Sequence, residues 1–337
     1  MPKSADVAGA TLPTIGFIGL GNMGSGMTAN LQKHGYPLMV NDINTEAARH
    51  LLPGGAIWCD SPAVVAAHSD VVITMLPTPR HVSQVILGPG GVLEGIPNGG
   101  TWVDMSTSVP DVTNQVHDLH QHRGLHCVDA PVSGMSIGAA NGTLQIFVGA
   151  EANDFGRLLP VFEAMGDPER IQHVGGNGTG YAVKLMLNQL WFSHLVATAE
   201  VMAIGVRAGV DLGVLRNALI ASPANSNFVQ HDVRSILDSG DYDEGFAVAL
   251  ACKDLGLSID LARSVGVSAE VSALVEQVFR RARATYGDGA GEMSPFKLYE
   301  DLIGQELRLV GAPVEPATPI ALDGSNALSA DDAIIVA

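Results

Sequence analysis

Residues 15–24 read Ile-Gly-Phe-Ile-Gly-Leu-Gly-Asn-Met-Gly, and the last three glycines have the G-x-G-x-x-G spacing of a dinucleotide-binding loop. The first of these glycines allows a tight turn, the second lets the backbone approach a pyrophosphate, and the third lets a helix pack closely on a strand. Backbone N–H groups and the helix dipole would then face the anion. The loop contributes six predicted cofactor-binding residues, Gly19, Leu20, Gly21, Asn22, Met23 and Gly24.

The sequence around this loop supplies the elements that the fingerprint requires. Apolar residues predict a strand over Ile15–Ile18, a helix over Met27–Lys33 and a second strand over Leu38–Val40. The second strand leads to Asp42, roughly 20 residues after the first glycine, where a carboxylate accepts hydrogen bonds from an adenosine ribose. The context therefore agrees with the glycine spacing.

Asp42 also bears on the choice of cofactor. A carboxylate at this position repels a 2′-phosphate, and the following Ile43-Asn44-Thr45 offers no arginine to receive one. We therefore expect NAD in preference to NADP. The alternative is that Asp42 caps a helix that begins near Thr45.

Composition limits the classes of function. The chain has 337 residues, of which 47% are hydrophobic and 16% charged, enough for two domains of a globular enzyme. Its net charge of −17 disfavours nucleic acid and anionic membranes as partners, so a small-molecule substrate is expected. Cys59, Cys127 and Cys252 form no C-x-x-C pair, and the first 13 residues lack the apolar centre of a secretory signal. These features favour the cytoplasm.

No metal site is predicted. A cluster of histidines lacks the spacing of a metal-binding motif, and surface positions explain it better: His117, His120, His122 and His126.

Strand and helix signals alternate through the first half of the chain. Five further strands are predicted, at Ile57–Cys59, Val71–Met75, Thr101–Asp104, Cys127–Ala130 and Gln145–Val148. Such alternation predicts an α/β fold of the Rossmann type, a doubly wound, mostly parallel sheet with helices on both faces.

Glycines near Val174–Gly178 separate this half from one that is helical throughout. The predicted helices are Tyr181–Ala208, Asp211–Ala221, Val229–Leu237, Phe246–Val265, Ser268–Thr285 and Pro295–Leu309. We expect a dinucleotide-binding domain over residues 14–176 and an all-helical substrate and dimerisation domain over 177–310. Extensions cover residues 1–13 and 311–337.

The first helix of the second half carries the strongest catalytic candidates. Lys184 and Asn188 are four residues apart and share one face of a helix that is otherwise mostly apolar. Burial lowers the pKa of a lysine toward neutrality and makes it a usable general acid or base. The alternatives are a lysine whose stem packs while its ammonium group reaches solvent, or, for the whole helix over Tyr181–Val206, a membrane span. Its polar residues disfavour the span.

Other runs are ambiguous from the residues alone. The run Asp129–Leu144 follows a strand and predicts a glycine- and serine-rich loop, in which Ser133 and the next two N–H groups could hold a carboxylate or form an ordinary turn. Asp104–Ser108 offers hydroxyl groups to a nicotinamide or caps a helix, and Met75–Pro79 could wall the adenosine. Lys253-Asp254 lies within a helix, where such a pair usually faces solvent.

Together these runs resemble the β-hydroxyacid dehydrogenase family, the group of 3-hydroxyisobutyrate dehydrogenase and tartronate semialdehyde reductase, with 6-phosphogluconate dehydrogenase more distant. The resemblance covers about residues 14 to 304. It rests on four motifs in family order: Gly19–Gly24, Asp129–Gly134 with Gly142-Thr143-Leu144, Gly178–Asn188, and Lys253-Asp254-Leu255.

The resemblance implies an activity and a set of roles. The chain would be an NAD-dependent 3-hydroxyacid oxidoreductase that forms a homodimer or homotetramer. Lys184 would be the catalytic acid and base, and Asn188, Ser133 and Gly134 would position the substrate. The implied cofactor contacts are Thr107 and Lys253 at the nicotinamide half and Leu76 and Pro77 at the adenosine half; His81 completes the predicted cofactor-binding residues.

Two departures from the family are visible. The family usually has Ser-Gly-Gly where this chain has Ser133-Gly134-Met135, so a side chain occupies the place of a glycine that lets substrate approach. The tail after Gly304 also exceeds the family's usual length. Two alternatives remain: an imine reductase of the same architecture, which generally has Asp or Tyr in place of Lys184, and a non-catalytic NAD-binding protein.

Overall fold

The computed structural model describes residues 12–243 and 245–309, without the side chains of residues 117 and 119–121. The expectations for the C-terminal extension and for nearly all of the N-terminal one fall outside these residues, as do those for the side chains of His117 and His120. The described chain divides into two compact units. The first contains the residues up to Ser193 and Asp243–Ser294, and the second contains His194–Tyr242 and the residues from Pro295 onward. The expected domain boundary at residue 176 stays a prediction.

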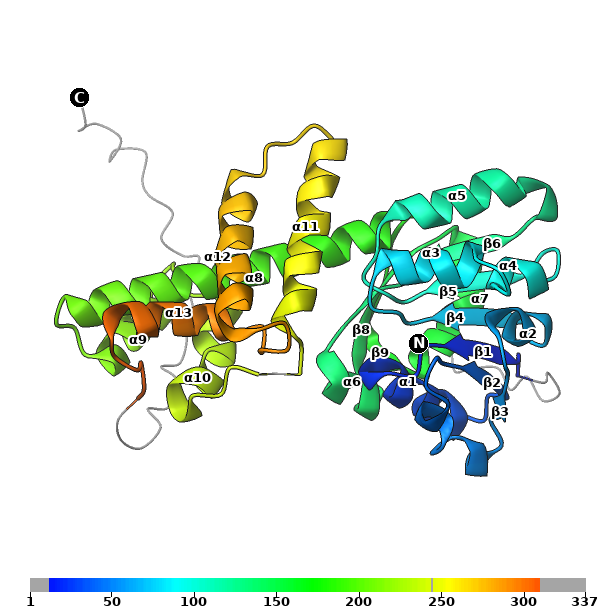
Figure 1. Cartoon of the computed structure of the whole chain (residues 1–337), viewed down its shortest axis with the longest axis horizontal. Helices are drawn as coiled ribbons and strands as arrows, with labels where there is room; N and C mark the ends of the chain where they lie inside the picture. The colour runs from blue at the N-terminus through cyan, green and yellow to red at the C-terminus, as the bar shows by residue number, and fades with distance from the viewer. Residues whose placement is uncertain (1–11, 244, 310–337) are drawn as a thin grey trace, which may run out of the picture. The chain divides into compact units, whose positions relative to one another are not determined.

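Within the described residues, the first unit is built on a nine-stranded sheet (Figure 1). The strands are β1 Ile15–Ile18, β2 Leu38–Asn41, β3 Ile57–Trp58, β4 Val71–Thr74, β5 Thr101–Asp104, β6 His126–Asp129, β7 Val132–Ser133, β8 Leu144–Gly149 and β9 Gly166–Gly175. Their order is β3-β2-β1-β4-β5-β6-β8-β7, with β9 paired to β8. Among the described strand pairings of the sheet, only those of β8 with β6 and with β7 are antiparallel, and β9 is parallel to β8. The predicted mostly parallel Rossmann-type sheet is confirmed.

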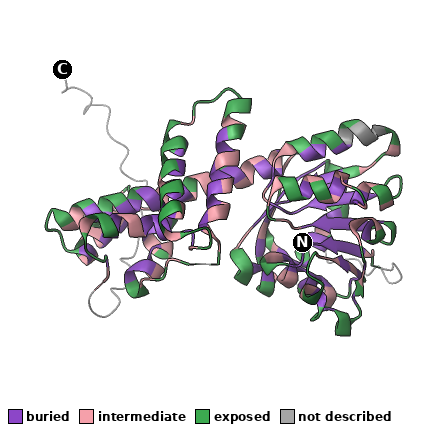
Figure 2. Cartoon of the chain, in the orientation of Figure 1, coloured by how far each residue is buried: buried purple, intermediate pink, exposed green. Residues whose placement is uncertain are grey.

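The central strands β1, β4 and β5 are buried on both faces, and Figure 2 shows buried strands in the middle of the sheet. The helices of the first unit are α1 Asn22–Lys33, α2 Pro62–Ala67, α3 Pro79–Leu87, α4 Val92–Gly95, α5 Pro110–His120, α6 Met135–Asn141, α7 Ala152–Glu163, the start of α8 Thr179–Arg207, α11 Val248–Ser264 and α12 Glu270–Tyr286. Alternate strand residues enter different cores: Phe17 packs with α1, α6 and α7, whereas Ile18 packs with α2 to α5. Helices therefore cover both faces, which is the doubly wound arrangement.

Two parts of the first unit differ from the sequence-based expectation. The run expected as a loop after β6 instead forms β7 and the helix α6. This helix packs closely on α1, where Asn30 Nδ2 donates to the Ala139 carbonyl at 2.7 Å, so a tertiary contact stabilises a segment that local glycines disfavour. The strand β9 was not predicted, because its residues are mainly polar and are interrupted by Pro168, and only half of them are exposed in the structure.

The second unit is helical. It contains the later part of α8, then α9 Leu212–Ile220, a π-helical turn Phe228–Asp232, α10 Arg234–Ser239 and α13 Ser294–Ile303. The last helix ends six residues before the predicted Leu309. Glu300 binds Arg308 at 2.5 Å and also accepts from the Tyr242 hydroxyl, which ties the chain after α13 to the rest of the unit.

The helix α8 is long and apolar enough to cross a membrane by length and composition alone. Core helices of globular proteins pass the same test. Leu185, Phe192 and Leu195 are buried along it, and the Phe192 ring contacts Phe279 of α12 at a centroid distance of 4.8 Å. These contacts are those of a core helix.

Candidate active site

The glycine loop between β1 and α1 has the geometry that its spacing predicts. Gly19 adopts φ +98°, and a Cβ on it would lie 2.3 Å from the Met75 carbonyl oxygen. A Cβ on Gly24 would lie 1.9 Å from the Gly19 oxygen, so only glycine lets α1 start this close to β1. A Cβ on Gly21 would meet nothing within 4 Å. The open side of the loop therefore leaves room for a ligand.

The start of α1 is available to an anion. Its N-cap is Gly21, no side chain caps it, and no acidic residue lies in its first turn. The first N–H groups of a helix have no partner within the helix, and they bind phosphate groups well. The loop and the helix start together fit the pyrophosphate of a dinucleotide.

Asp42 lies directly beyond the end of β2 and is held by the backbone. Its Oδ2 accepts from Leu20 N at 2.7 Å, and its Oδ1 accepts from Asn44 N at 2.8 Å. Each oxygen keeps a second acceptor site for a ribose hydroxyl. The cap of the short helix that starts at Thr45 is Asn44, whose side chain accepts from Glu46 N. The alternative that Asp42 caps this helix is therefore wrong.

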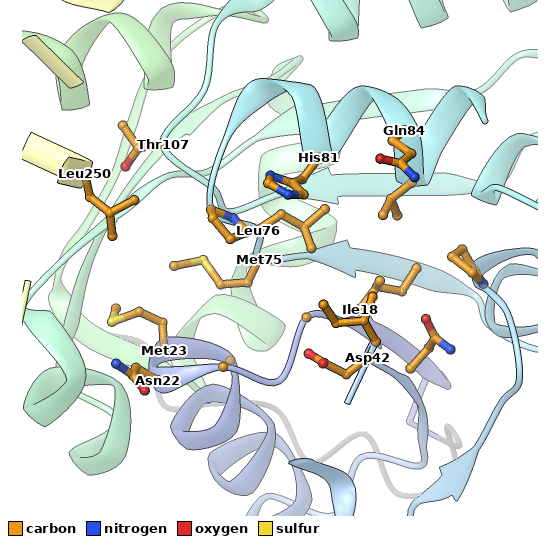
Figure 3. Close-up of a pocket in the computed structure, with 18 of the residues that line it drawn as sticks. Ile18, Asn22, Met23, Asp42, Met75, Leu76, His81, Gln84, Thr107 and Leu250 are labelled. Carbon is orange, nitrogen blue, oxygen red and sulfur yellow. The ribbon is translucent and has the colours of Figure 1, made fainter. Parts of the chain in front are cut away.

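A cleft of about 900 Å³ lies at the carboxyl ends of the central strands, the usual ligand position in an open α/β sheet. Figure 3 shows Asp42 and Gln84 toward one end of it and Thr107 and Leu250 toward the other. All the predicted cofactor-binding residues except Leu20 line this cleft: Gly19, Gly21, Asn22, Met23, Gly24, Asp42, Leu76, Pro77, His81, Thr107 and Lys253. Leu20 lines a smaller adjoining hollow that also contains Asp42.

Lys253 joins this cleft to a second group of polar residues. Its Nζ donates to the Thr107 carbonyl at 3.1 Å and pairs with Asp254 Oδ1 at 2.9 Å. Asp254 is buried, and its Oδ2 accepts from Asn188 Nδ2 at 2.7 Å. The alternative that this lysine–aspartate pair only faces solvent is therefore wrong.

Lys184 lies one helical turn before Asn188 and is half-buried. Desolvation lowers the pKa of Lys184 from 10.5 to about 8, the nearby charge of Asp254 raises it, and that of Lys253 lowers it. A lysine with this pKa exchanges a proton near neutral pH.

The predicted substrate-positioning residues lie outside the cleft lining. Ser133 pairs with Gln145 in the sheet, and Gly134 precedes α6 with φ +127°. Lys184 and Asn188 are also absent from the lining, and Asn188 connects to it through Asp254 and Lys253. Of the residues that follow Gly134, Ser136 and Met135 line the cleft, and Met135 is 41% exposed and has φ +54°. Among described residues it alone has positive φ without being glycine.

Sequence reasoning missed several residues of this region. Phe246, just before α11, and Leu250, in α11, both line the cleft. They were missed because they lie far along the chain from the other residues of the cleft. Asp254 was named but assigned no role, because its partner Asn188 lies 66 residues away. Among the described residues, no group of three His, Cys, Asp or Glu side chains could hold a metal ion.

Comparison with known proteins agrees with this geometry. Residues 14–176 match the family described as the NAD binding domain of 6-phosphogluconate dehydrogenase, and residues 178–299 match the NAD-binding domain of NADP-dependent 3-hydroxyisobutyrate dehydrogenase. The chain is 36% identical to 2-(hydroxymethyl)glutarate dehydrogenase of Eubacterium barkeri, over 86% of this chain and 96% of that protein. The chain belongs to the β-hydroxyacid dehydrogenase family.

Two other members of the family extend the comparison. The NAD-dependent L-serine dehydrogenase of Pseudomonas aeruginosa is 37% identical over 79% of this chain and 91% of its own length. The structure of Mycobacterium tuberculosis 3-hydroxyisobutyrate dehydrogenase with L-serine superposes with a TM-score of 0.77 at 29% identity, covering 86% of this chain and 99% of that one. The comparisons thus show family membership, the Rossmann-type fold and the presence of NAD- or NADP-binding domains.

Proposed function

We propose that the chain is an NAD-dependent 3-hydroxyacid dehydrogenase in which Lys184 is the general acid and base. The observation that carries this proposal is the placement of Lys184: the lysine is half-buried one helical turn from Asn188, whose amide donates to the buried carboxylate of Asp254. Burial lowers the pKa of Lys184 to about 8. A lysine on an apolar helix has this pKa only where it is desolvated, and perturbed groups of this kind cluster at active sites.

The chemistry divides between the cofactor and the side chains. A bound nicotinamide supplies the hydride acceptor in oxidation and the donor in reduction. In oxidation Lys184, in its neutral form, takes the proton from the substrate hydroxyl; in reduction its ammonium form returns that proton to the oxygen. Asn188 donates one N–H to Asp254, which fixes the amide and leaves its other N–H for the substrate oxygen. Ser133 and neighbouring N–H groups are proposed to bind the carboxylate.

The substrate class follows from what the relatives' names have in common. L-serine and 2-(hydroxymethyl)glutarate, which name two relatives, both carry a CH₂OH group on the carbon beside a carboxylate. We infer that this chain oxidises a 3-hydroxyacid of the same type to its semialdehyde. Met135 occupies cleft volume that a glycine would leave free, so it is proposed to select among substituents on that carbon.

The preference for NAD over NADP is part of the proposal. Asp42 supports it, because a carboxylate whose two oxygens are fixed by backbone N–H groups cannot turn away from a 2′-phosphate. We also propose a cytoplasmic homo-oligomer. The three cysteines are free and buried, in keeping with a reducing compartment.

The test is formation of reduced nicotinamide, followed by absorbance with NAD and NADP in parallel. The substrates are 3-hydroxyisobutyrate, L-serine and 2-(hydroxymethyl)glutarate; propan-1-ol, which lacks the carboxylate, is the control. We expect turnover of at least one hydroxyacid with NAD and none of propan-1-ol. Reduction of a cyclic imine without turnover of any hydroxyacid would instead identify an imine reductase, and tight NAD binding without either reaction a binding protein.

A further inference from the structure

Two buried aspartates lie side by side at the carboxyl ends of neighbouring parallel strands. Asp104 ends β5, Asp129 ends β6, and the two residues are partners in the register of the sheet. Both are fully buried. A buried carboxylate is costly unless hydrogen bonds compensate it, so the donors that these two aspartates accept from are informative.

Both aspartates bind the first turn of α8 through the same residue. Asp129 accepts from Gly178 N at 2.6 Å and from Tyr181 N at 2.9 Å. Asp104 accepts from the Tyr181 hydroxyl at 2.8 Å. Tyr181 is itself 1% exposed. Its backbone and its side chain are thus held by two adjacent strand ends, which fixes both the depth and the rotation of the helix start.

The packing around Asp129 leaves little freedom to this arrangement. A Cβ on Gly149 would lie 2.6 Å from the carboxylate of Asp129, and a Cβ on Gly180 would lie 2.8 Å from it. Two glycines are therefore required where the strand β8 and the helix α8 approach the carboxylate.

The other oxygen of Asp104 leads to the cofactor cleft. Its Oδ1 accepts from Ser106 Oγ at 2.6 Å and from Thr74 Oγ1 at 2.8 Å. Ser106 Oγ in turn accepts from Leu76 N at 2.8 Å, and Leu76 lines the cleft. A continuous chain of hydrogen bonds therefore runs from Leu76 through Ser106 and Asp104 to Tyr181, and its links at Asp104 are buried.

Lys184 lies next to the end of this chain. Tyr181, Lys184 and Asn188 follow one another at spacings of three and four residues, so they share one face of α8. Tyr181 is bound to the sheet and Asn188 to Asp254 of α11. The lysine is therefore held between two anchored residues, one turn away on each side.

We propose that Tyr181 and Ser106, acting through Asp104, are positioning residues that fix Lys184 of α8 relative to Leu76 and the cofactor cleft that Leu76 lines. This inference rests on the proposed function, because it assigns a consequence to the placement of Lys184. Neither residue touches the reacting atoms. Each acts by holding the helix start and the loop in one geometry, and a small misplacement of a catalytic group is enough to slow a reaction.

The test is a double-mutant cycle on kcat with Tyr181→Phe and Ser106→Ala. Each variant removes one hydroxyl group and cuts the same chain of hydrogen bonds at a different link. We expect each single variant to lower kcat about tenfold and the double variant to lower it by about the same factor, because a chain already cut once has no further positioning to lose. The dissociation constant of NAD, measured by titration calorimetry, should change less than about threefold for Tyr181→Phe.

The control is Tyr36→Phe, the same chemical change at a buried tyrosine of the same unit that lies outside the cleft lining. It should keep the wild-type kcat. If Tyr181→Phe does not fold, the kcat of the Ser106→Ala variant alone tests the positioning role. A wild-type kcat in either variant, or a double variant slowed by the product of the single effects, would overturn the positioning role. Failure of the proposed function is separate, because it would appear as turnover by Lys184→Met.

Discussion

The cofactor end and the catalytic end of this active site are built in different ways. The part of the cofactor end that fits a pyrophosphate and a ribose uses the backbone of one continuous turn, Gly19–Gly24, together with Asp42 at the next strand. The proposed catalytic end uses side chains from distant segments, because Asp254 of α11 raises the pKa of Lys184 and Tyr181, one turn before Lys184, is held by two strand ends. Local sequence therefore specifies the first end, and tertiary packing specifies the second.

This difference predicts different responses to substitution. Changes at the cofactor end should weaken cofactor binding in small steps, since several backbone N–H groups each contribute part of the binding energy. Changes at the catalytic end should act mainly on kcat, because one group carries the proton and others only hold it in place.

The largest effect is expected for Lys184→Met. Turnover should fall by about 1000-fold or more, because the proton acceptor is lost, while calorimetry should find the NAD dissociation constant within about twofold of wild type.

The free energy of unfolding of Lys184→Met should be higher than that of the wild type. Since the pKa of Lys184 is about 8 in the folded chain and 10.5 for a fully hydrated lysine side chain, the unfolded chain binds more protons between these pH values, and wild-type stability rises with pH there.

Removing this charge should therefore stabilise the variant by up to about 3 kcal/mol at pH 7 in chemical denaturation. The matched control is Lys33→Met, at an exposed lysine in the last turn of α1, which should leave turnover unchanged. Turnover near the wild-type rate in Lys184→Met would contradict the proposed role of Lys184 and with it the difference between the two ends.

The next largest effect is expected for Asp254→Asn. The carboxylate raises the pKa of Lys184, so its loss should move the apparent pKa of hydroxyacid oxidation below about 8. The variant should also lose about 3 kcal/mol of stability, because Lys253 keeps its charge without its partner. Rate–pH profiles and denaturant titrations measure the two effects. An unchanged profile would show that Lys184 is not coupled to this carboxylate.

A smaller effect, confined to binding, is expected for Asp42→Asn. The KM for NAD should rise about tenfold, since hydrogen bonds to a charged acceptor weaken, and kcat should stay within about twofold of wild type. The relative efficiency with NADP should increase, because the negative charge facing a 2′-phosphate is gone. Steady-state kinetics with both cofactors provide the measurement, and a fall in kcat as large as that of Asp254→Asn would erase the distinction between the two ends.

The smallest effect is expected for Met135→Gly. Positive φ strains a residue with a Cβ, so glycine should stabilise the fold by less than about 1 kcal/mol and widen the cleft for larger hydroxyacids. Ile137→Gly, two residues on in α6 and 65% exposed, should instead destabilise by about 1 kcal/mol. Thermal melts and substrate panels compare the pair. Equal destabilisation of both variants would contradict the strain at Met135.

The same contrast explains what could be predicted from the sequence. The glycine loop, the seven main strands and Asp42 are local patterns, and each was predicted close to its observed place. The helix α6 was missed because its stability depends on the contact of Asn30 with Ala139, more than 100 residues apart. The strand β9 was missed because an exposed edge strand with a proline has no apolar alternation.

The catalytic end was predictable only in part. The spacing of Lys184 and Asn188 indicated a shared helix face, but nothing local indicates that Asn188 meets Asp254 or that Tyr181 meets Asp104. Ser133 and Gly134 were predicted from their motif, and their substrate-binding role remains a prediction because they lie outside the cleft lining.

The central claim is that Lys184 exchanges the substrate proton, and the pH dependence of the wild-type reaction tests it most directly. With saturating cofactor, kcat/KM for hydroxyacid oxidation should rise through a single ionisation near pH 8 and then level off, because the base must be neutral. Reduction of the semialdehyde should fall over the same range, because the acid must be protonated. Rates in both directions that do not change between about pH 6.5 and 9.5 would contradict the role of Lys184.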